Sequence, residues 1–326
     1  MIKRVPISLK TCFVYALFVA GLIAGCKKEE DVVEDEPPVE VPVVPVVPVV
    51  PVVPTTPTSS RFISKVYEYL PAPGQFINES LGSLEGAQKI IGDVKSAGLV
   101  SLGGYGGYII FGFDHSVVNN TGKDLAIYGN PIGGANNWSE PGIVMVSQDV
   151  NGNGKADDIW YELAGSEYTA AGTIKKYEIT YTNPKATANV TWTDNQGKNG
   201  AVEVNRYHNH NYYPLFAANQ ESLTFKGTLL SSTFGVTANG IYVNNPFSWG
   251  YSDNYSTGDD FATNGYNSFD ISHAVDATGK QVDLKTIDFV KVYTGQNEKG
   301  NTLMGEISTE VRGAADLSIK ETVIAK

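Results

Sequence analysis

Residues 149–158 place oxygen-bearing side chains at the spacing of a calcium-binding loop. A hard cation needs oxygens at loop positions 1, 3, 5 and 9, and a glycine at position 6 permits the sharp turn that wraps them around it. The residue at position 7 can offer its backbone carbonyl. The residues that we expect to hold Ca²⁺ are Asp149, Asn151, Asn153, Lys155, Asp157 and Asp158.

This loop departs from the EF-hand at position 12, where Trp160 replaces the bidentate glutamate and Glu162 is the nearest substitute. It is more similar to the Asp/Asn-Gly calcium loops of dockerins and thrombospondin type 3 repeats. The alternative is an ordinary glycine-rich hairpin turn between two strands. If calcium binds here, we expect its role to be structural.

Aromatic and polar side chains gather in two further segments, 207–216 and 249–266. Flat rings supply apolar contact area, and neighbouring carboxylates, amides and imidazoles supply directional hydrogen bonds, a mixture that suits sugars. We expect the two segments to converge on one ligand; the alternative is that their rings fill the core. The candidate ligand-binding residues are Tyr207, His208, His210, Tyr212, Tyr213, Trp249, Tyr251, Asp253 and Tyr255.

Catalytic motifs are missing from the sequence. The spacing of His208 and His210 is seen in metal sites, but a zinc site would also need carboxylates here. There is no Gly-x-Ser-x-Gly, His-Glu-x-x-His or Walker motif, and the acids are too scattered to select a general acid and base. A binding protein is therefore favoured over an enzyme, and the enzyme question stays open.

The first 26 residues have the features of an export signal sequence. Basic residues precede an apolar run over residues 11–25, which is too short for a transmembrane helix and ends in Ala24-Gly25-Cys26. Small residues before a cysteine match the lipobox of bacterial lipoproteins. The sequence therefore predicts a signal peptide over residues 1–25 and acylation of Cys26, which leaves no free cysteine for a disulfide or thiolate chemistry.

Residues 26–60 are predicted to form a stalk. The segment 27–31 is Lys-Lys-Glu-Glu-Asp, which resembles the export signal of surface lipoproteins in Bacteroidetes-type bacteria. This resemblance implies a lipid anchor in the outer membrane and exposure on the cell surface. Proline then recurs every third residue from Pro42 to Pro57, which matches the three-residue turn of polyproline II.

The elements that must position all these residues are β-strands. Only 18% of residues are charged, against about 25% in average soluble proteins, and 34 glycines and 18 tyrosines suit short strands and turns. We predict an all-β domain over residues 61–318, a large jelly-roll β-sandwich with a possible second sandwich subdomain joined near 205–216, and a tail over 319–326. One short helix is expected over 85–94. The predicted strands are 108–113, 125–128, 143–148, 159–163, 177–181, 188–192, 222–228, 240–243 and 287–293.

Two stretches together resemble bacterial cell-surface proteins that have a galactose-binding-like jelly roll and are often labelled PKD-type. One covers residues 106–167 and includes Ser139-Glu140-Pro141-Gly142; the other covers residues 268–292. The resemblance runs from about Tyr67 to Asp316 and implies a fold more than an activity. Some such lipoproteins accompany outer-membrane nutrient transporters of the TonB-dependent type, including those for corrinoids.

These observations predict a surface lipoprotein that binds an extracellular nutrient, with glycan as the default ligand, as an accessory to uptake. The alternatives are binding of a corrinoid or another small nutrient beside a transporter, a structural or adhesive surface module, and a carbohydrate-active hydrolase. The net charge of −11 argues against a nucleic-acid partner, since such a protein would carry a basic face.

Overall fold

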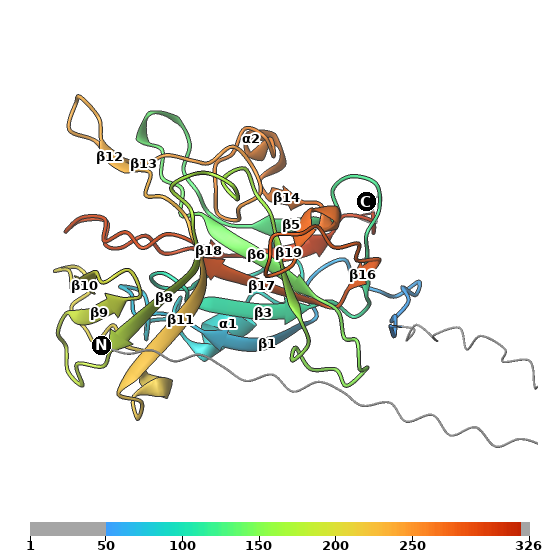
Figure 1. The fold of residues 1–326 in the computed structure, drawn as a ribbon, viewed down its shortest axis with the longest axis horizontal. Coiled ribbons are helices and arrows are strands. Elements are labelled where there is room, and N and C mark those ends of the chain that lie inside the picture. The colour runs from blue at the N-terminus through green and yellow to red at the C-terminus, as the bar shows by residue number, and fades with distance from the viewer. Residues whose placement is uncertain (1–49, 321–326) are drawn as a thin grey trace, which may run out of the picture. The chain divides into compact units, whose positions relative to one another are not determined.

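The computed structural model describes residues 50–320, which form antiparallel β-sheets joined by turns and a few short helical segments (Figure 1). The all-β sandwich predicted from the sequence is confirmed. The central sheet has the strand order β1-β3-β17-β6-β7-β15. Its strands are β1 (Lys65–Leu70), β3 (Tyr108–Gly112), β17 (Phe289–Thr294), β6 (Gly142–Ser147), β7 (Trp160–Leu163) and β15 (Ala274–Val275).

Smaller sheets surround this central sheet. A four-stranded sheet has the order β10-β9-β8-β11 and a three-stranded sheet the order β14-β5-β19, and three strand pairs join β12 to β13, β16 to β4 and β18 to β2. Their bounds are β2 (Val100–Ser101), β4 (Val117–Val118), β5 (Leu125–Tyr128), β8 (Ile174–Thr182), β9 (Val190–Asp194), β10 (Asn199–Val202), β11 (Ser222–Leu229), β12 (Phe234–Val236), β13 (Tyr242–Asn244), β14 (Asn267–Phe269), β16 (Thr286–Ile287), β18 (Glu310–Val311) and β19 (Gly313–Asp316).

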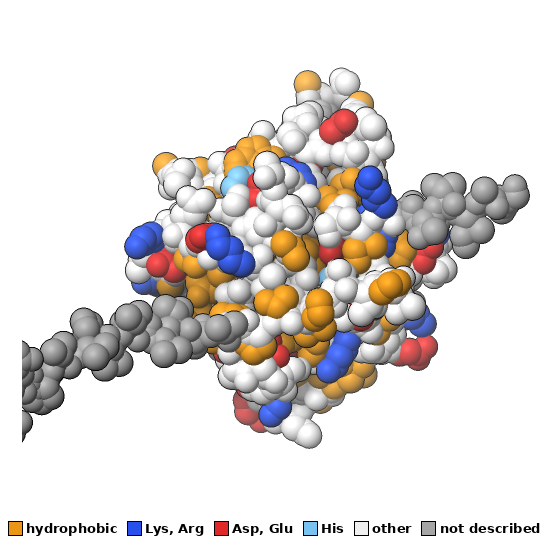
Figure 2. Space-filling view, turned by 90° about the vertical axis from the view of Figure 1, so that its right-hand side faces the viewer, with side chains coloured by type: hydrophobic (Ala, Val, Ile, Leu, Met, Phe, Trp, Pro, Cys, Tyr) orange, Lys and Arg blue, Asp and Glu red, His pale blue; other side chains and the backbone are white. Residues whose placement is uncertain are grey.

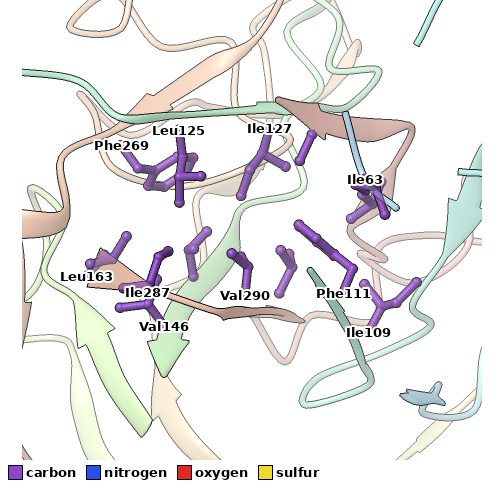
Figure 3. Packing of buried hydrophobic residues seen from close by; sticks show 14 of the residues in the cluster. Ile63, Ile109, Phe111, Leu125, Ile127, Val146, Leu163, Phe269, Ile287 and Val290 are labelled. Carbon is purple, nitrogen blue, oxygen red and sulfur yellow. The ribbon is translucent and has the colours of Figure 1, made fainter. Parts of the chain in front are cut away.

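The central sheet is buried on both faces. Successive side chains of a strand point to opposite faces, so Ile109 and Phe111 of β3 enter one core while Tyr108 packs against the other. In the first core these residues pack against Leu125 and Ile127 of β5 (Figure 3). The second core lies between the central sheet and the four-stranded sheet.

The predicted second sandwich is thus a second layer rather than a separate subdomain. The four-stranded sheet shares the central sheet with the first sandwich, and all described residues belong to one compact unit. The segment 205–216 is not a seam between subdomains, because its Tyr212 and Tyr213 side chains pack into the second core.

The predicted helix is shorter than expected. Helix α1 covers only Leu84–Gln88, with Ser83 as its N-cap accepting from the Gly86 N–H at 3.0 Å. Gly92 adopts a left-handed φ of 91° and donates to the Ile63 carbonyl instead of continuing the helix. The other helix, α2 (Phe261–Asn264), is a single turn, and η1 (Gly134–Asn136), η2 (Leu215–Ala217) and η3 (Ile271–His273) are 3₁₀ turns.

The end of the predicted stalk lies against the domain. Val53 and Ser116 exchange two hydrogen bonds of 2.9 and 2.8 Å, and the Ser60 N–H donates to Asp114 Oδ2 at 3.0 Å. The chain therefore joins the domain before the predicted boundary at residue 61. The signal peptide, Cys26, residues 27–49 and most of the predicted tail lie outside the described residues.

Two surface features bear on membrane and nucleic-acid contacts. No helix within residues 50–320 combines the length and apolar character needed to cross a membrane. On the face shown in Figure 2, basic and acidic side chains are interspersed, so this face offers no basic patch for nucleic acid.

Candidate ligand-binding cavity

Trp192 lies at the β9–β10 hairpin, opposite Gly200 in the strand register. A Cβ atom on Gly200 would sit 2.5 Å from the Trp192 ring, closer than packed atoms approach. Glycine at this position therefore allows the indole to lie across the neighbouring strand. The ring then forms one wall of a cavity beside the hairpin.

This cavity, here called the Trp192 cavity, has a volume of about 430 Å³, within the range of small-molecule sites. Four segments form it: the turn before β3, strand β8, the β9–β10 hairpin, and the loop 297–306. Its lining residues are Gly104, Tyr105, Tyr181, Trp192, Asn199, Gly200, Ala201, Val202, Glu203, Asn297, Glu298, Lys299 and Glu306.

Two residues that line the cavity each carry a buried polar atom without a hydrogen-bond partner. Glu306 Oε1 accepts the Gln75 N–H at 2.8 Å, but Oε2 of the same carboxyl group has no partner. The Tyr105 hydroxyl also lacks one. An unsatisfied buried polar group costs about 1–3 kcal/mol, so a polar molecule that reached either atom would gain by pairing with it.

Burial sets the protonation states of Glu306 and Tyr105. Desolvation raises the pKa of Glu306 to about 7, although the nearby His208 acts in the opposite direction. Burial also raises the pKa of the Tyr105 hydroxyl well above its usual value, so this group stays protonated. Near neutral pH Tyr105 is therefore a neutral phenol, and Glu306 exchanges between its protonated and ionised forms.

A second cavity, of about 590 Å³, adjoins the first. Glu203 and Lys299 line both cavities, and their Oε1 and Nζ atoms are 3.8 Å apart. Asn205, Arg206 and Tyr242 line the second cavity farther on. A ligand longer than the Trp192 cavity would pass this exposed ion pair.

Three of the predicted ligand rings belong to the core, so the prediction that they stack on a ligand is wrong. Tyr212, Tyr213 and Tyr251 are at most 1% exposed. Tyr212 Oη accepts the Asn205 N–H and Tyr251 Oη accepts the Glu167 N–H, both at 3.0 Å. Their rings fill the second core while their hydroxyls are satisfied by backbone, the arrangement expected of structural tyrosines.

The two predicted histidines share one carboxylate. The Nδ1 atoms of His208 and His210 lie 3.1 and 3.4 Å from Glu79 Oε1, and both rings are half-buried. Within residues 50–320 they join no group of three His, Cys, Asp or Glu ligands close enough to share a metal ion. The neighbouring Tyr207 is 59% exposed and its ring lies under the Arg206 guanidinium.

The second predicted segment lies elsewhere. Trp249 packs against His273, with 5.1 Å between ring centroids, and Tyr255 packs against Phe261 at 5.3 Å. Asp253 is 1% exposed and lies among other buried acids. None of the nine predicted ligand residues lines the Trp192 cavity or the second cavity. Asn205 and Arg206, which line the second cavity, directly precede the first predicted segment, 207–216.

The predicted calcium loop is an exposed, hydrogen-bonded turn. The Asp149 carboxylate accepts the N–H groups of Asn153 and Gly154 at 3.0 and 2.8 Å, and Asn153 Oδ1 accepts that of Lys155 at 2.8 Å. The Asn153 amide donates to Asp157, and the Val150 N–H donates to Asp158. These bonds suit both a calcium loop and a plain turn, so calcium binding stays a prediction.

No protein-family model matches the chain, and no curated protein is significantly similar to it.

Proposed function

We propose that this protein is a surface-exposed lipoprotein that binds an extracellular nutrient in the Trp192 cavity, with glycan as the default ligand. The observation that carries the proposal is a cavity of ligand size whose lining combines the aromatic residues Trp192, Tyr105 and Tyr181 with carboxylates and amides. A sugar presents apolar C–H faces to such a ring and hydroxyls that both donate and accept.

The position of the stalk supports this assignment. Residues 50–60 join the domain at the end opposite the β9–β10 hairpin (Figure 1). The Trp192 cavity therefore does not lie where the described part of the stalk meets the domain. The proposal has two further parts. The protein hands its ligand to a TonB-dependent transporter, and its sandwich has a galactose-binding-like origin.

The test is a calorimetric titration of the purified mature chain with defined oligosaccharides and with cyanocobalamin as a corrinoid probe. For the probe that binds, Trp192→Ala should raise Kd about fivefold, because a lost ring contact is worth about 1 kcal/mol. Trp249→Ala is the matched control: it removes a half-buried tryptophan that does not line the cavity, and it should leave Kd unchanged.

An unchanged Kd for a folded Trp192→Ala variant would contradict the proposed site. Binding of cyanocobalamin instead of any oligosaccharide would select the corrinoid alternative. If no probe binds, the structural or adhesive alternative gains, because the cavity would then serve no ligand of these classes.

Hydrolysis is a second candidate function because three acids, Glu203, Glu298 and Glu306, line the Trp192 cavity. Glu306, with its raised pKa, has the property of a general acid, and a neighbouring carboxylate would serve as base or nucleophile. The length of the oligosaccharide recovered after the same titration separates the two functions. A hydrolase would shorten a bound oligosaccharide and Glu306→Gln would stop this, whereas a binding protein would return the oligosaccharide intact.

A further inference from the structure

Three carboxylates that are far apart in the sequence meet inside the domain, and none of these residues lines either cavity. Glu140 precedes β6, Asp253 lies in the segment 249–266, and Glu310 begins β18. One carboxylate oxygen from each lies within 4.8 Å of the others. We call these residues the acid cluster.

Backbone groups hold the acid cluster in place. Asp253 Oδ1 accepts the Asn130 N–H at 2.9 Å, and Oδ2 accepts the Glu310 N–H at 2.8 Å. Glu140 Oε1 accepts the Ser308 N–H at 2.9 Å. The carboxylates are thus oriented by the fold itself, and the segments that carry them pack directly against one another.

The acid cluster contains an unpartnered buried oxygen and has no cationic side chain paired with it among residues 50–320. Glu310 is 97% buried, since only 3% of its surface is exposed. Its carboxyl group is hydrogen-bonded to Glu140 and Ser101, but its Oε1 atom has no partner. Among residues 50–320, no lysine, arginine or histidine forms an ion pair with any of the three acids. Buried carboxylates without a cation are strongly unfavourable and either take up protons or bind one.

We propose that the acid cluster binds a calcium ion that joins the start of β6, the segment 249–266 and β18. The donors are all oxygens, which hard divalent cations prefer, and no nitrogen or sulfur ligand is present to favour a transition metal. Calcium accepts a variable set of oxygens, so water and backbone carbonyls can complete its shell. This site is separate from the loop 149–158 and does not depend on the proposed function.

The competing arrangement is a set of acids that share protons. Burial and the charge of Glu306 raise the pKa of Glu140 to about 7. Burial and repulsion by Glu140 raise the pKa values of Asp253 and Glu310 well above their usual values when no cation is present. Proton sharing would make stability independent of calcium. Calcium binding would make stability depend on it, because an ion that binds only the folded state stabilises that state by mass action.

The experiment uses a background that has lost the exposed loop. In the purified mature chain, Asp149→Ala with Asp157→Ala removes loop ligands, so any remaining calcium response reports on another site. Thermal unfolding of this variant at neutral pH is compared in EDTA and in millimolar Ca²⁺. We expect Tm to rise by about 5 °C or more with Ca²⁺ at a hundredfold excess over Kd.

Adding Glu310→Gln to this background should abolish the calcium-dependent rise, since the amide keeps the size of the side chain but removes its charge. Equal Tm values in EDTA and Ca²⁺ for the background variant would overturn the proposal, as would a calcium response that survives Glu310→Gln. If Glu310→Gln fails to fold, terbium luminescence of the background variant decides: one bound ion per chain supports the site, and none overturns it.

Discussion

Glu306 is the residue whose ionisation links the Trp192 cavity to stability. It is buried, one oxygen accepts the Gln75 N–H, and its pKa is raised from 4.5 to about 7 by desolvation. Between these two values the folded chain keeps the proton that the unfolded chain loses. The unfolded state therefore binds fewer protons, and the free energy of unfolding falls as pH rises through this window.

Glu306→Gln should remove this pH dependence, because the amide keeps the acceptor for Gln75 and cannot ionise. A shift to about 7 corresponds to about 3 kcal/mol, at about 1.4 kcal/mol per pKa unit. The variant should match the wild type near pH 4.5 and exceed its unfolding free energy by about this amount above pH 7. Urea unfolding at a series of pH values measures the difference, and parallel wild-type and variant curves would contradict the assignment.

Local composition predicts the burial of a single residue poorly. Tyr212, Tyr213 and Tyr251 stand among polar neighbours, a setting typical of binding loops, yet their loops fold back over the second core. Trp192 occurs in a strand where a tryptophan is unremarkable, and only its register with Gly200 turns it toward a cavity. The Trp192 cavity joins residues about 200 positions apart, and no spacing along the chain encodes that meeting.

At the scale of elements, alternation and β-branched residues predict most long strands. Each of the nine predicted segments overlaps a strand, with shifts of one to three residues at many of their ends. The missed strands are short or poor in β-branched residues, as in β10 (Asn199–Val202), β14 (Asn267–Phe269) and β19 (Gly313–Asp316). Pairing with β9 and β5 makes them strands, so tertiary context overrides their weak propensity.

The loop between β6 and β7 is the element for which calcium is predicted from the sequence. A cation bound only by the folded loop stabilises the fold, by about 2.7 kcal/mol at a hundredfold excess over Kd. In a Glu310→Gln background, which isolates the loop from the acid cluster, Tm should fall with EDTA and recover with Ca²⁺. Asp149→Ala with Asp157→Ala should then abolish the response, while identical melting curves before these substitutions would leave the loop an ordinary turn.

The whole molecule is organised around a sheet that serves two cores. Strands β6 and β17 carry nearly continuous apolar side chains, with Val144 and Val292 facing one core and Ile143 and Tyr293 the other. Such runs are typical of strands covered on both faces, so the sequence contained a signal for the second layer. Which sheet covers which face depends on long-range packing and could not be derived from those runs.

The arrangement of stalk and cavity leads to a prediction for the intact cell. If Cys26 is acylated, Cys26→Ser should release the protein from membranes or leave the unprocessed precursor, because the lipid chains supply the anchor. Membrane fractionation with detection of the acylated peptide measures this. A Cys26→Ser variant that stays acylated and membrane-bound would contradict the lipobox assignment.

Surface display adds a second readout on the same cells. Residues 54–58 are exposed and lie at the end of the domain opposite the β9–β10 hairpin, so a protease added to intact cells should cut this part of the chain and release a folded domain. That released domain should bind its ligand as the anchored protein does, because the Trp192 cavity is built entirely from residues beyond 103. Protection from protease until the outer membrane is broken would place the domain in the periplasm instead.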